Sequence, residues 1–327
     1  MSRFFGFVFA ACLLAISTST TVLAANPDWP KTLALATSSP GGVFYVYGET
    51  LAPFLTKRLG IDVNHLPTQG PVHNVKLIET GGAQFGIVTM GVALQGWNGT
   101  GDWTMGKQFR SMRALVPLYD SPLQMFALRR SSITTVADLD GKRVCVGPRA
   151  GTGGAYASHI LSTLGISADL KYGSFDQMSM ELLSSDCAAV VTVLGAPVPA
   201  FVTAETKEPM RFIALSSEQI DALRKAMPEF SLSRIAAGTY SSLEKDHVTV
   251  GIYNFLIGRA DLPEDMVYKL VGSVHEAQPL LIKAHSSARE MRPENVDKNT
   301  FLPFHPGAVR YYREIGIKIP DELAPMN

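Results

Sequence analysis

The sequence predicts an α/β protein with two lobes and mostly parallel sheets. Strand patterns alternate with helical patterns along most of the chain, which is typical of helices layered on a sheet. Two glycine-rich turns, at 39–42 and 150–154, each stand where a strand pattern gives way to a helical one. The chain has 327 residues, of which 46% are apolar, so it is long enough to bury two separate cores.

Residues 1–24 have the features of a cleavable export signal. Arg3 precedes an apolar run at 4–16, and the small residues Val22 and Ala24 stand before the expected cleavage point. The alternative is a membrane anchor, but this run is shorter than the roughly 20 residues that span a bilayer, and polar residues follow it at once. We therefore exclude 1–24 from the fold and expect an exported protein.

Charge and cysteine content favour a small partner over nucleic acid. Lysine plus arginine equals aspartate plus glutamate at 29 each, so no electrostatic footprint for nucleic acid is present. After the signal segment the only cysteines are Cys145 and Cys187, which either form a disulfide in an oxidising compartment or serve as two small buried apolar side chains. The sequence has no CxxC pair and only scattered histidines, so we expect no metal site and no cofactor.

The first lobe begins with repeated strand-helix units. Strands are predicted at 31–37, 61–66 and 85–90, and helices at 44–59 and 72–80. Gly60 follows the first helical pattern directly, so we expect it to end that helix. Extended segments at 112–116 and 123–128, interrupted by Pro117 and Pro122, then predict a crossing between lobes.

The second lobe repeats the pattern before the chain returns. We expect a short helix and turn at 136–141, strands at 143–147 and 188–194, and helices at 154–164 and 218–226, with a polar stretch at 231–246. An apolar strand at 249–257 and helices at 264–284 and 307–315 complete the first lobe. The predicted domains are 25–120 with 249–327 for one lobe and 121–248 for the other.

The two glycine turns predict an anion site. Glycine lets the backbone approach a ligand closely, and the first N–H groups of the following helix have no intrahelical acceptor. Ligands of open α/β sheets bind beyond the carboxyl ends of the strands, so both turns are expected to open onto one cleft.

Four stretches of the chain resemble one known family. They are 38–45 (SSPGGVFY), 136–144 (VADLDGKRV) with 146–148 (VGP), 150–154 (AGTGG) and 305–312 (HPGAVRYY). In this order and spacing they resemble the TAXI-type solute receptors of TRAP transporters. The resemblance implies a type II-like periplasmic binding protein fold with hinge-linked Rossmann-like lobes. It also implies a periplasmic receptor, not an enzyme, that binds a small organic acid and delivers it to a TRAP-type membrane permease.

The resemblance is incomplete at positions that bear on specificity. Pro71 stands where the family usually has a serine, the third strand ends Thr89-Met90-Gly91 without the family's aspartate, and Ala188 replaces another aspartate. These losses remove groups that could meet an ammonium. We therefore hypothesise a ligand without one, such as a keto or hydroxy acid.

The expected binding residues come from both lobes. In the middle turn, the Thr152 hydroxyl with the N–H groups of Gly153 and Gly154 is expected to hold a carboxylate; the alternative is a tight turn for helix packing. Phe44 and Tyr45 are expected to wall the cleft or enter the core, Asn74 to donate to the solute or to backbone groups, and Arg149 to pair with a carboxylate or stay exposed. The remaining candidates are Ser39, Gly42, Gly70, Thr89, Met90, Phe175, Gly195 and Pro197.

Two other functions stay open at this point. One is an exported α/β enzyme that uses the middle turn for a phosphate-bearing cofactor, with Asp169 as its ribose partner, although the chain has no GxSxG, HExxH or P-loop lysine. The other is a sensing module that presents its ligand-bound form to a membrane signalling partner.

Overall fold

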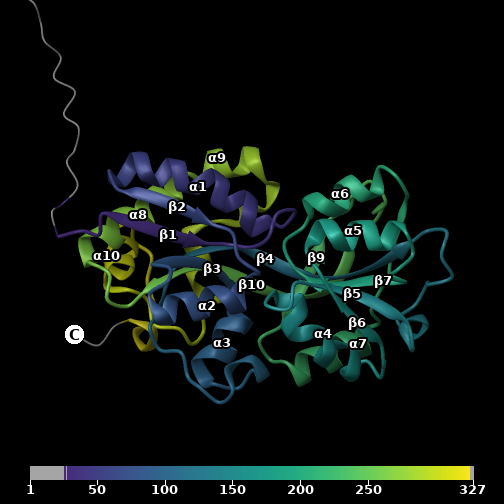
Figure 1. Ribbon diagram of the computed structural model, residues 1–327. Helices are drawn as coiled ribbons and strands as arrows, with labels where there is room; N and C mark the ends of the chain where they lie inside the picture. Colours follow the sequence, from purple (N-terminus) through teal and green to yellow (C-terminus); the bar gives the residue numbers. More distant parts are fainter. Residues whose placement is uncertain (1–25, 27, 325–327) are drawn as a thin grey trace, which may run out of the picture.

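Two α/β lobes lie side by side, joined by two long strands (Figure 1). The computed structural model describes residue 26 and residues 28–324, so the predicted signal segment 1–24 lies outside the described residues. The joining strands are β4 (Met112–Leu128) and β10 (His247–Arg259), which pair antiparallel along most of their length. The predicted α/β architecture with two lobes is therefore confirmed.

The strands form one continuous hydrogen-bonded array in the order β2-β1-β3-β10-β4-β7-β5-β6, with β8 on β4 and β9 on β10. Within each lobe the βα units are parallel: β1 pairs with β2 and β3, and β5 pairs with β6 and β7. The other strands are β1 (Thr32–Ala36), β2 (Asp62–Leu66), β3 (Phe85–Thr89), β5 (Arg143–Gly147), β6 (Asp169–Tyr172), β7 (Ala189–Val193), β8 (Met210–Phe212) and β9 (Ser231–Ile235).

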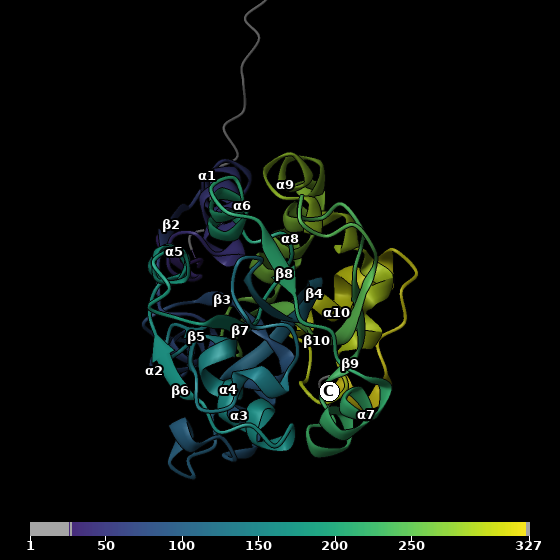
Figure 2. The same cartoon turned by 90° about the vertical axis from the view of Figure 1, so that its right-hand side faces the viewer.

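Helices cover both faces of the array in each lobe (Figure 1), and Figure 2 shows the molecule with the second lobe toward the viewer. The helices are α1 (Val43–Leu59), α2 (Pro71–Thr80), α3 (Met90–Asn98), α4 (Thr152–Thr163), α5 (Phe175–Leu183), α6 (Pro199–Glu205), α7 (Ser217–Ala226), α8 (Glu264–Glu276), α9 (Gln278–Ala284) and α10 (Pro306–Glu314). Short 3₁₀ turns lie at η1 (Asp102–Thr104), η2 (Ala137–Leu139), η3 (Ser286–Glu290), η4 (Pro293–Lys298) and η5 (Asp321–Leu323). None of the described helices has the length and apolar character needed to cross a membrane.

Local signals explain where several helices begin and end. Gly60 adopts the left-handed conformation (φ 71°) after α1 and donates its N–H to Thr56, as its position predicts. At α7 the side chains of Ser216 and Gln219 cap each other's backbone N–H groups. Pro279 stands at the start of α9, so the helix predicted at 264–284 is two helices instead of one.

The predicted break in the crossing segment is wrong, because β4 runs through both prolines as one strand. Proline lacks an N–H and is tolerated in a sheet where the ladder is already irregular. Pro117 lies at such a point: Tyr253 pairs with Asp120 and Phe255 with Pro117, a shift of register between the two strands. The hinge region is therefore a bulged strand pair.

Other elements differ from the prediction. The third strand ends at Thr89, one residue early, because Met90 already begins α3. The stretch at 231–246, interpreted only as polar, contains β9, in which the buried positions are Ser233 and Ile235 and the exposed ones include Leu232, so it lacks the alternation that marks a strand. Helices α3, α5 and α6 and strands β6 and β8 were not predicted. The domain boundaries at 120 and 249 stay a prediction.

Candidate functional site

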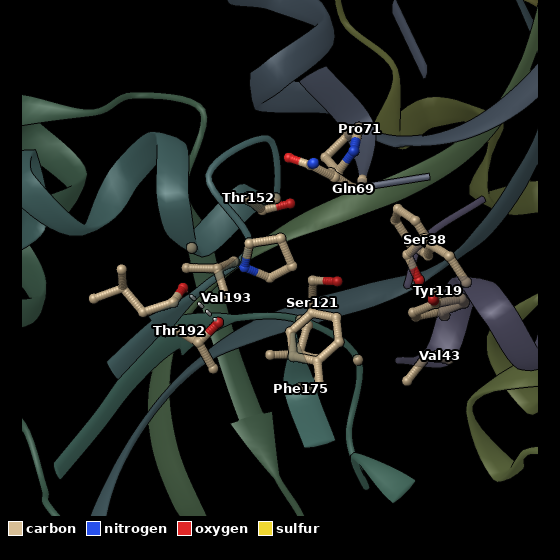
Figure 3. A pocket seen from close by; sticks show the side chains of 18 residues that line it. Ser38, Val43, Gln69, Pro71, Tyr119, Ser121, Thr152, Phe175, Thr192 and Val193 are labelled. Carbon is tan, nitrogen blue, oxygen red and sulfur yellow. Dashed lines mark hydrogen bonds between the residues drawn. The ribbon is translucent and has the colours of Figure 1, made fainter. Parts of the chain in front are cut away.

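A cavity of about 30 Å³ lies between the lobes, at the carboxyl ends of strands from both (Figure 3). Its lining is formed by Ser38, Val43, Phe44, Gln69, Gly70, Pro71, Tyr119, Ser121, Val146, Pro148, Gly151, Thr152, Gly153, Phe175, Thr192, Val193, Leu194 and Gly195. None of these side chains carries a formal charge. The middle glycine turn lines this cavity with Gly151, Thr152 and Gly153, whereas the first turn is represented only by Ser38 and Val43, the residues on either side of 39–42.

Four helices begin at the cavity. The first residues of α1, α2, α4 and α5, namely Val43, Pro71, Thr152 and Phe175, all line it, and each helix is nine residues or longer. The N-terminus of a helix carries roughly half a positive charge from its aligned peptide dipoles. The cavity is therefore electropositive without a cationic side chain.

Backbone donors are available at two of these helix starts. Helix α1 follows Gly42 and α4 follows Gly151, and neither cap residue supplies a side-chain hydrogen bond. The N–H groups of 43–45 and 152–154 donate to no carbonyl oxygen among the described residues. These groups are the donors expected of an anion site.

Direct bonds hold the lobes together around the cavity. The N–H of Val72 donates to the carbonyl oxygen of Ala150 at 3.0 Å, and the Thr89 and Thr152 hydroxyls lie 3.0 Å apart. A Cβ on Gly42 would stand 2.7 Å from the Phe175 ring, so the two lobes touch there as well. The lobes are in a closed arrangement.

Two hydroxyls from the hinge strand also line the cavity, and sequence reasoning missed both. Tyr119 and Ser121 lie on β4 and are fully buried. Asn254 of β10 donates to the Ser121 Oγ and to the Tyr119 carbonyl, each at 2.7 Å. The Tyr119 hydroxyl has no partner among the described residues, and burial raises the pKa of this tyrosine. The only signal was two hydroxyl-bearing residues at alternate positions of an apolar strand.

Six predicted binding residues line the cavity: Phe44, Gly70, Thr152, Gly153, Phe175 and Gly195. Five others lie at its margins. Three of them contact lining residues: Gly42 packs on Phe175, Thr89 bonds to Thr152, and Gly154 packs on the Pro148 carbonyl. The carbonyl oxygen of Pro197 accepts a hydrogen bond from His285. Ser39, next to Ser38, has a buried Oγ without a partner among the described residues.

Four predicted residues make other contacts in this structure and do not line the cavity. The ring of Tyr45 packs on His65, at 4.9 Å between centroids, because the position after Phe44 is turned about 100° around the helix. The guanidinium of Arg149 stacks on Tyr172 at 4.1 Å. Met90 lines a different cavity, of about 730 Å³, which also includes Asp120.

Asn74 is occupied by the backbone of its own lobe. Its amide nitrogen donates to the carbonyl oxygens of Thr37 and Ile87, each at 2.7 Å, and its Oδ1 accepts from the Thr68 hydroxyl at 2.7 Å. The side chain is fully buried. Of the two roles open for Asn74, the structure therefore has the one that satisfies backbone groups.

The middle glycine turn serves packing as well as the cavity. A Cβ on Gly153 would overlap the Val146 carbonyl oxygen and stand 2.5 Å from the Thr192 hydroxyl. Glycine is therefore required for α4 to lie this close to β5 and β7. The two interpretations of this turn apply together.

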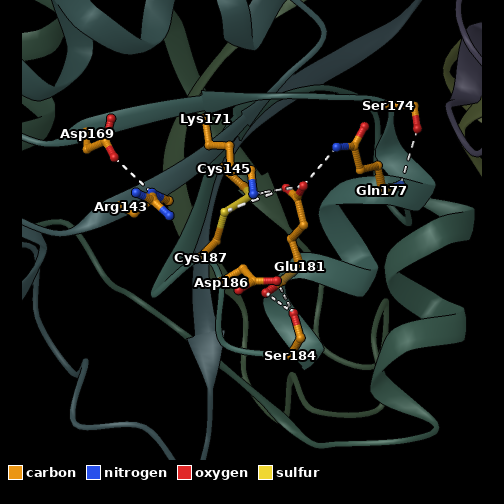
Figure 4. A network of polar contacts seen from close by, with 10 residues as sticks. All are labelled: Arg143, Cys145, Asp169, Lys171, Ser174, Gln177, Glu181, Ser184, Asp186 and Cys187. Atoms are coloured by element: carbon orange, nitrogen blue, oxygen red, sulfur yellow. Dashed lines mark hydrogen bonds and ion pairs between the residues drawn. A yellow bond between two sulfur atoms is a disulfide. The ribbon is translucent and has the colours of Figure 1, made fainter.

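Cys145 and Cys187 form a disulfide, with their Cα atoms 5.8 Å apart (Figure 4). Glu181 lies beside it and pairs with Lys171 at 3.0 Å. Among the described residues, these two cysteines and Glu181 form the one group with atoms close enough for a metal ion. The bridged sulfurs are not thiolates, so this group does not have the chemistry of a zinc site.

This architecture is that of the two-lobed periplasmic binding proteins. Similar solved structures include a periplasmic transporter, 14% identical over 90% of this chain and 99% of that chain, with a TM-score of 0.54. The alkanesulfonate-binding protein SsuA from Xanthomonas axonopodis pv. citri, bound to MOPS, is 14% identical over 87% of this chain and 84% of that one (TM-score 0.50). A putative L-cystine ABC transporter from Listeria monocytogenes is 14% identical over 80% of this chain and 98% of that one (TM-score 0.50).

These likenesses confirm the predicted fold. Residues 35–316 match the NMT1-like family, and the chain belongs to that family.

Proposed function

We propose that this protein is a periplasmic solute receptor that binds a small organic anion, a carboxylate, between its two lobes. The observation that carries the proposal is the start of four helices at one cavity lined by no charged side chain. Free N–H groups at such helix starts favour an anion.

The same lining disfavours a ligand with an ammonium group. An ammonium buried between the lobes needs a carboxylate or several acceptor oxygens to offset its desolvation. The lining offers hydroxyls, one amide and backbone groups, but no Asp or Glu. This supports the hypothesis that the ligand is a keto or hydroxy acid.

Hinge closure is the proposed mechanism. A cavity of about 30 Å³ holds roughly two waters, so a solute enters only when the lobes are further apart than here. A bound anion that contacts α1 and α2 from one lobe and α4 and α5 from the other would favour the closed arrangement. The donors for such contacts are on both sides of the cavity.

The membrane partner is proposed to be a TRAP-type permease, on the resemblance of the four sequence stretches. Two of the similar solved structures are an alkanesulfonate-binding protein and a putative L-cystine ABC transporter, so an ABC-type partner is the alternative to a TRAP-type permease. Uptake assays that combine this receptor with TRAP or with ABC membrane subunits distinguish the two. Uptake with neither, together with ligand-dependent binding to a signalling protein, would favour the sensing alternative.

The enzyme alternative has less support. Its ribose partner, Asp169, pairs with Arg143 at 2.8 Å and does not line the cavity. No observation favours a cofactor at the middle turn over a small anion.

The testing experiment is thermal unfolding of the exported chain against organic acids, amino acids, sugars and nucleotides. A ligand at 100 times its Kd stabilises a protein by about 2.7 kcal/mol, which raises the midpoint by several degrees. We expect small carboxylates to raise it and nucleotides to leave it unchanged. A shift with a nucleotide cofactor alone would contradict the proposal.

A further inference from the structure

The strand β4 contributes two hydroxyl-bearing residues to the cavity lining. Tyr119 and Ser121 are two residues apart, so they lie on the same face of the strand, and both line the cavity. Figure 3 shows Tyr119 beside Ser38 and Val43, and Ser121 nearer the middle of the site. Asp120, between them in sequence, lines the cavity of about 730 Å³ instead.

Packing, and not a hydrogen bond, holds the Tyr119 ring. Its centroid lies 5.0 Å from that of Tyr47 and 6.3 Å from that of Phe44. On another side, a Cβ on Gly195 would stand 2.5 Å from the ring, so glycine is needed there. The ring is therefore confined by three neighbours, and its hydroxyl has a defined position.

Tyr119 is exceptional among the buried tyrosines because its hydroxyl has no partner. Within residues 28–324 the other large buried tyrosine hydroxyls are bonded: Tyr47 to Ser287, Tyr156 to Glu229, Tyr240 to Gln124 and Tyr312 to the Leu115 carbonyl. An unpartnered buried hydroxyl is unfavourable, so such a group at a cavity wall indicates a missing hydrogen-bond partner, to which the phenol can donate.

Ser121 supplies a second donor at the same place. Its Oγ accepts from Asn254, at 2.7 Å, which leaves its own proton free to donate. Two donors can share one acceptor oxygen that has two lone pairs, and a ketone oxygen is such an acceptor. An ammonium at this position would face two donors.

We infer that the ligand is a 2-oxo acid whose keto oxygen accepts hydrogen bonds from Tyr119 and Ser121 while its carboxylate lies at the helix N-termini. This rests on the proposed function and makes Tyr119 the residue that determines specificity.

The test compares acids that differ only in the 2-oxo group. Calorimetric titration measures pyruvate against propionate and 2-oxoglutarate against glutarate, with wild type, Y119F and Y47F. We expect wild type to prefer one 2-oxo acid over its partner about tenfold or more, since a site built to bond an oxygen rejects an analogue without it. In Y119F this ratio should fall to about twofold, with little change for propionate or glutarate.

The matched control is Y47F, which removes the neighbouring tyrosine hydroxyl that is bonded to Ser287. We expect it to keep the preference for the 2-oxo acid and to lower the unfolding midpoint. Y119F should leave the midpoint unchanged or raise it, because it removes an unpartnered buried group.

Each outcome has a distinct meaning. A 2-oxo preference that Y119F does not change, or equal affinity for L-glutamate and 2-oxoglutarate, overturns this inference and leaves the proposed function standing. Absence of binding by all four acids overturns the inference, and a thermal-unfolding panel without a shift for any carboxylate overturns the proposed function as well.

Discussion

The Nε2 of His285 lies 2.7 Å from the carbonyl oxygen of Pro197, and this hydrogen bond joins the two lobes. His285 precedes η3, beside α9, whereas Pro197 follows β7 at the other side of the cavity. Ser287 bonds to the other ring nitrogen at 2.8 Å and to the Tyr47 hydroxyl at 3.1 Å. Because the Pro197 oxygen can only accept, Nε2 carries the proton and Nδ1 accepts.

Loss of this bond should shift the lobes toward the open arrangement. We expect H285A to lose about 1 kcal/mol of closed-state stability, the usual net value of one hydrogen bond, or about fivefold in the equilibrium. Small-angle scattering of the protein without added ligand should report a larger radius of gyration. Y268F, which removes a bond between α8 and Glu314 within one lobe, is the control. Equal radii for H285A and Y268F would contradict this role.

The buried histidines should make the protein less stable in mild acid. Burial lowers the pKa of His305 from 6.5 to about 4, so the unfolded chain takes up a proton that the folded protein refuses. The contribution of His305 to the free energy of unfolding is then at its maximum above pH 6.5. It falls by up to about 1.4 kcal/mol per pH unit between pH 6.5 and 4. Burial also lowers the pKa of His275 to about 4, which adds to the effect.

The variant H305N isolates the contribution of His305. Its Nδ1 accepts the Gly307 N–H at the start of α10, and asparagine is also a good cap, so the helix should form as before. Urea unfolding at pH 7 and pH 4.5 should give a smaller loss of stability in H305N than in wild type. H159N, at an exposed position, controls for the substitution. An identical loss in wild type and H305N would show that His305 does not titrate as expected.

Gly153 should not tolerate a side chain. The Cβ of an alanine there would overlap the Val146 carbonyl, so α4 must move away from the sheet. We expect G153A to cost about 1–3 kcal/mol, typical of overpacking, and to weaken binding of the carboxylate in the proposed site. G272A is a suitable control, because its Cβ would stand 3.1 Å from a Tyr311 ring atom and alanine favours the helix α8. Equal stability of the two variants in urea would argue against this packing role.

The disulfide between Cys145 and Cys187 should contribute to stability. The bridge closes a loop with a sequence separation of 42, and such loops typically give about 2–4 kcal/mol. We expect a phosphine reductant, or the double substitution C145A/C187A, to lower the unfolding midpoint by several degrees. Thiol titration reports whether reduction is complete. A full release of two thiols with an unchanged midpoint would contradict the prediction.

Much of the fold could be predicted from the chain, because its signals are local. The start of the sheet, the end of α1 at Gly60 and the strand β5 all follow from patterns within a few residues. Elements that lack a strong pattern were missed, among them β6 and β8, which are four and three residues long. Their extended form depends on pairing with β5 and β4, and a single short segment does not encode that pairing.

The site was predicted in part for the same reason. Glycine turns before helices are local signals, and the middle turn correctly indicated that Thr152 and Gly153 reach the cavity. The direction of a side chain is not local: Asn74 and Arg149 remained candidate ligand groups until their actual partners, backbone carbonyls and the Tyr172 ring, were known.

The sequence by itself determined the alternation of strands and helices and the glycine turns that let the backbone approach closely. It also determined the balance of positive and negative charge, which does not favour binding to nucleic acid. Only the tertiary structure decided that four helix starts meet at one cavity and that Tyr119 stands there with a free hydroxyl. The physical reason is that the dipoles of separate helices point at one place only when distant segments pack together. Whether a hydroxyl such as that of Tyr119 has a hydrogen-bond partner is decided by the same packing. Those contacts are set by the register of β4 against β10 and by the closing of one lobe on the other.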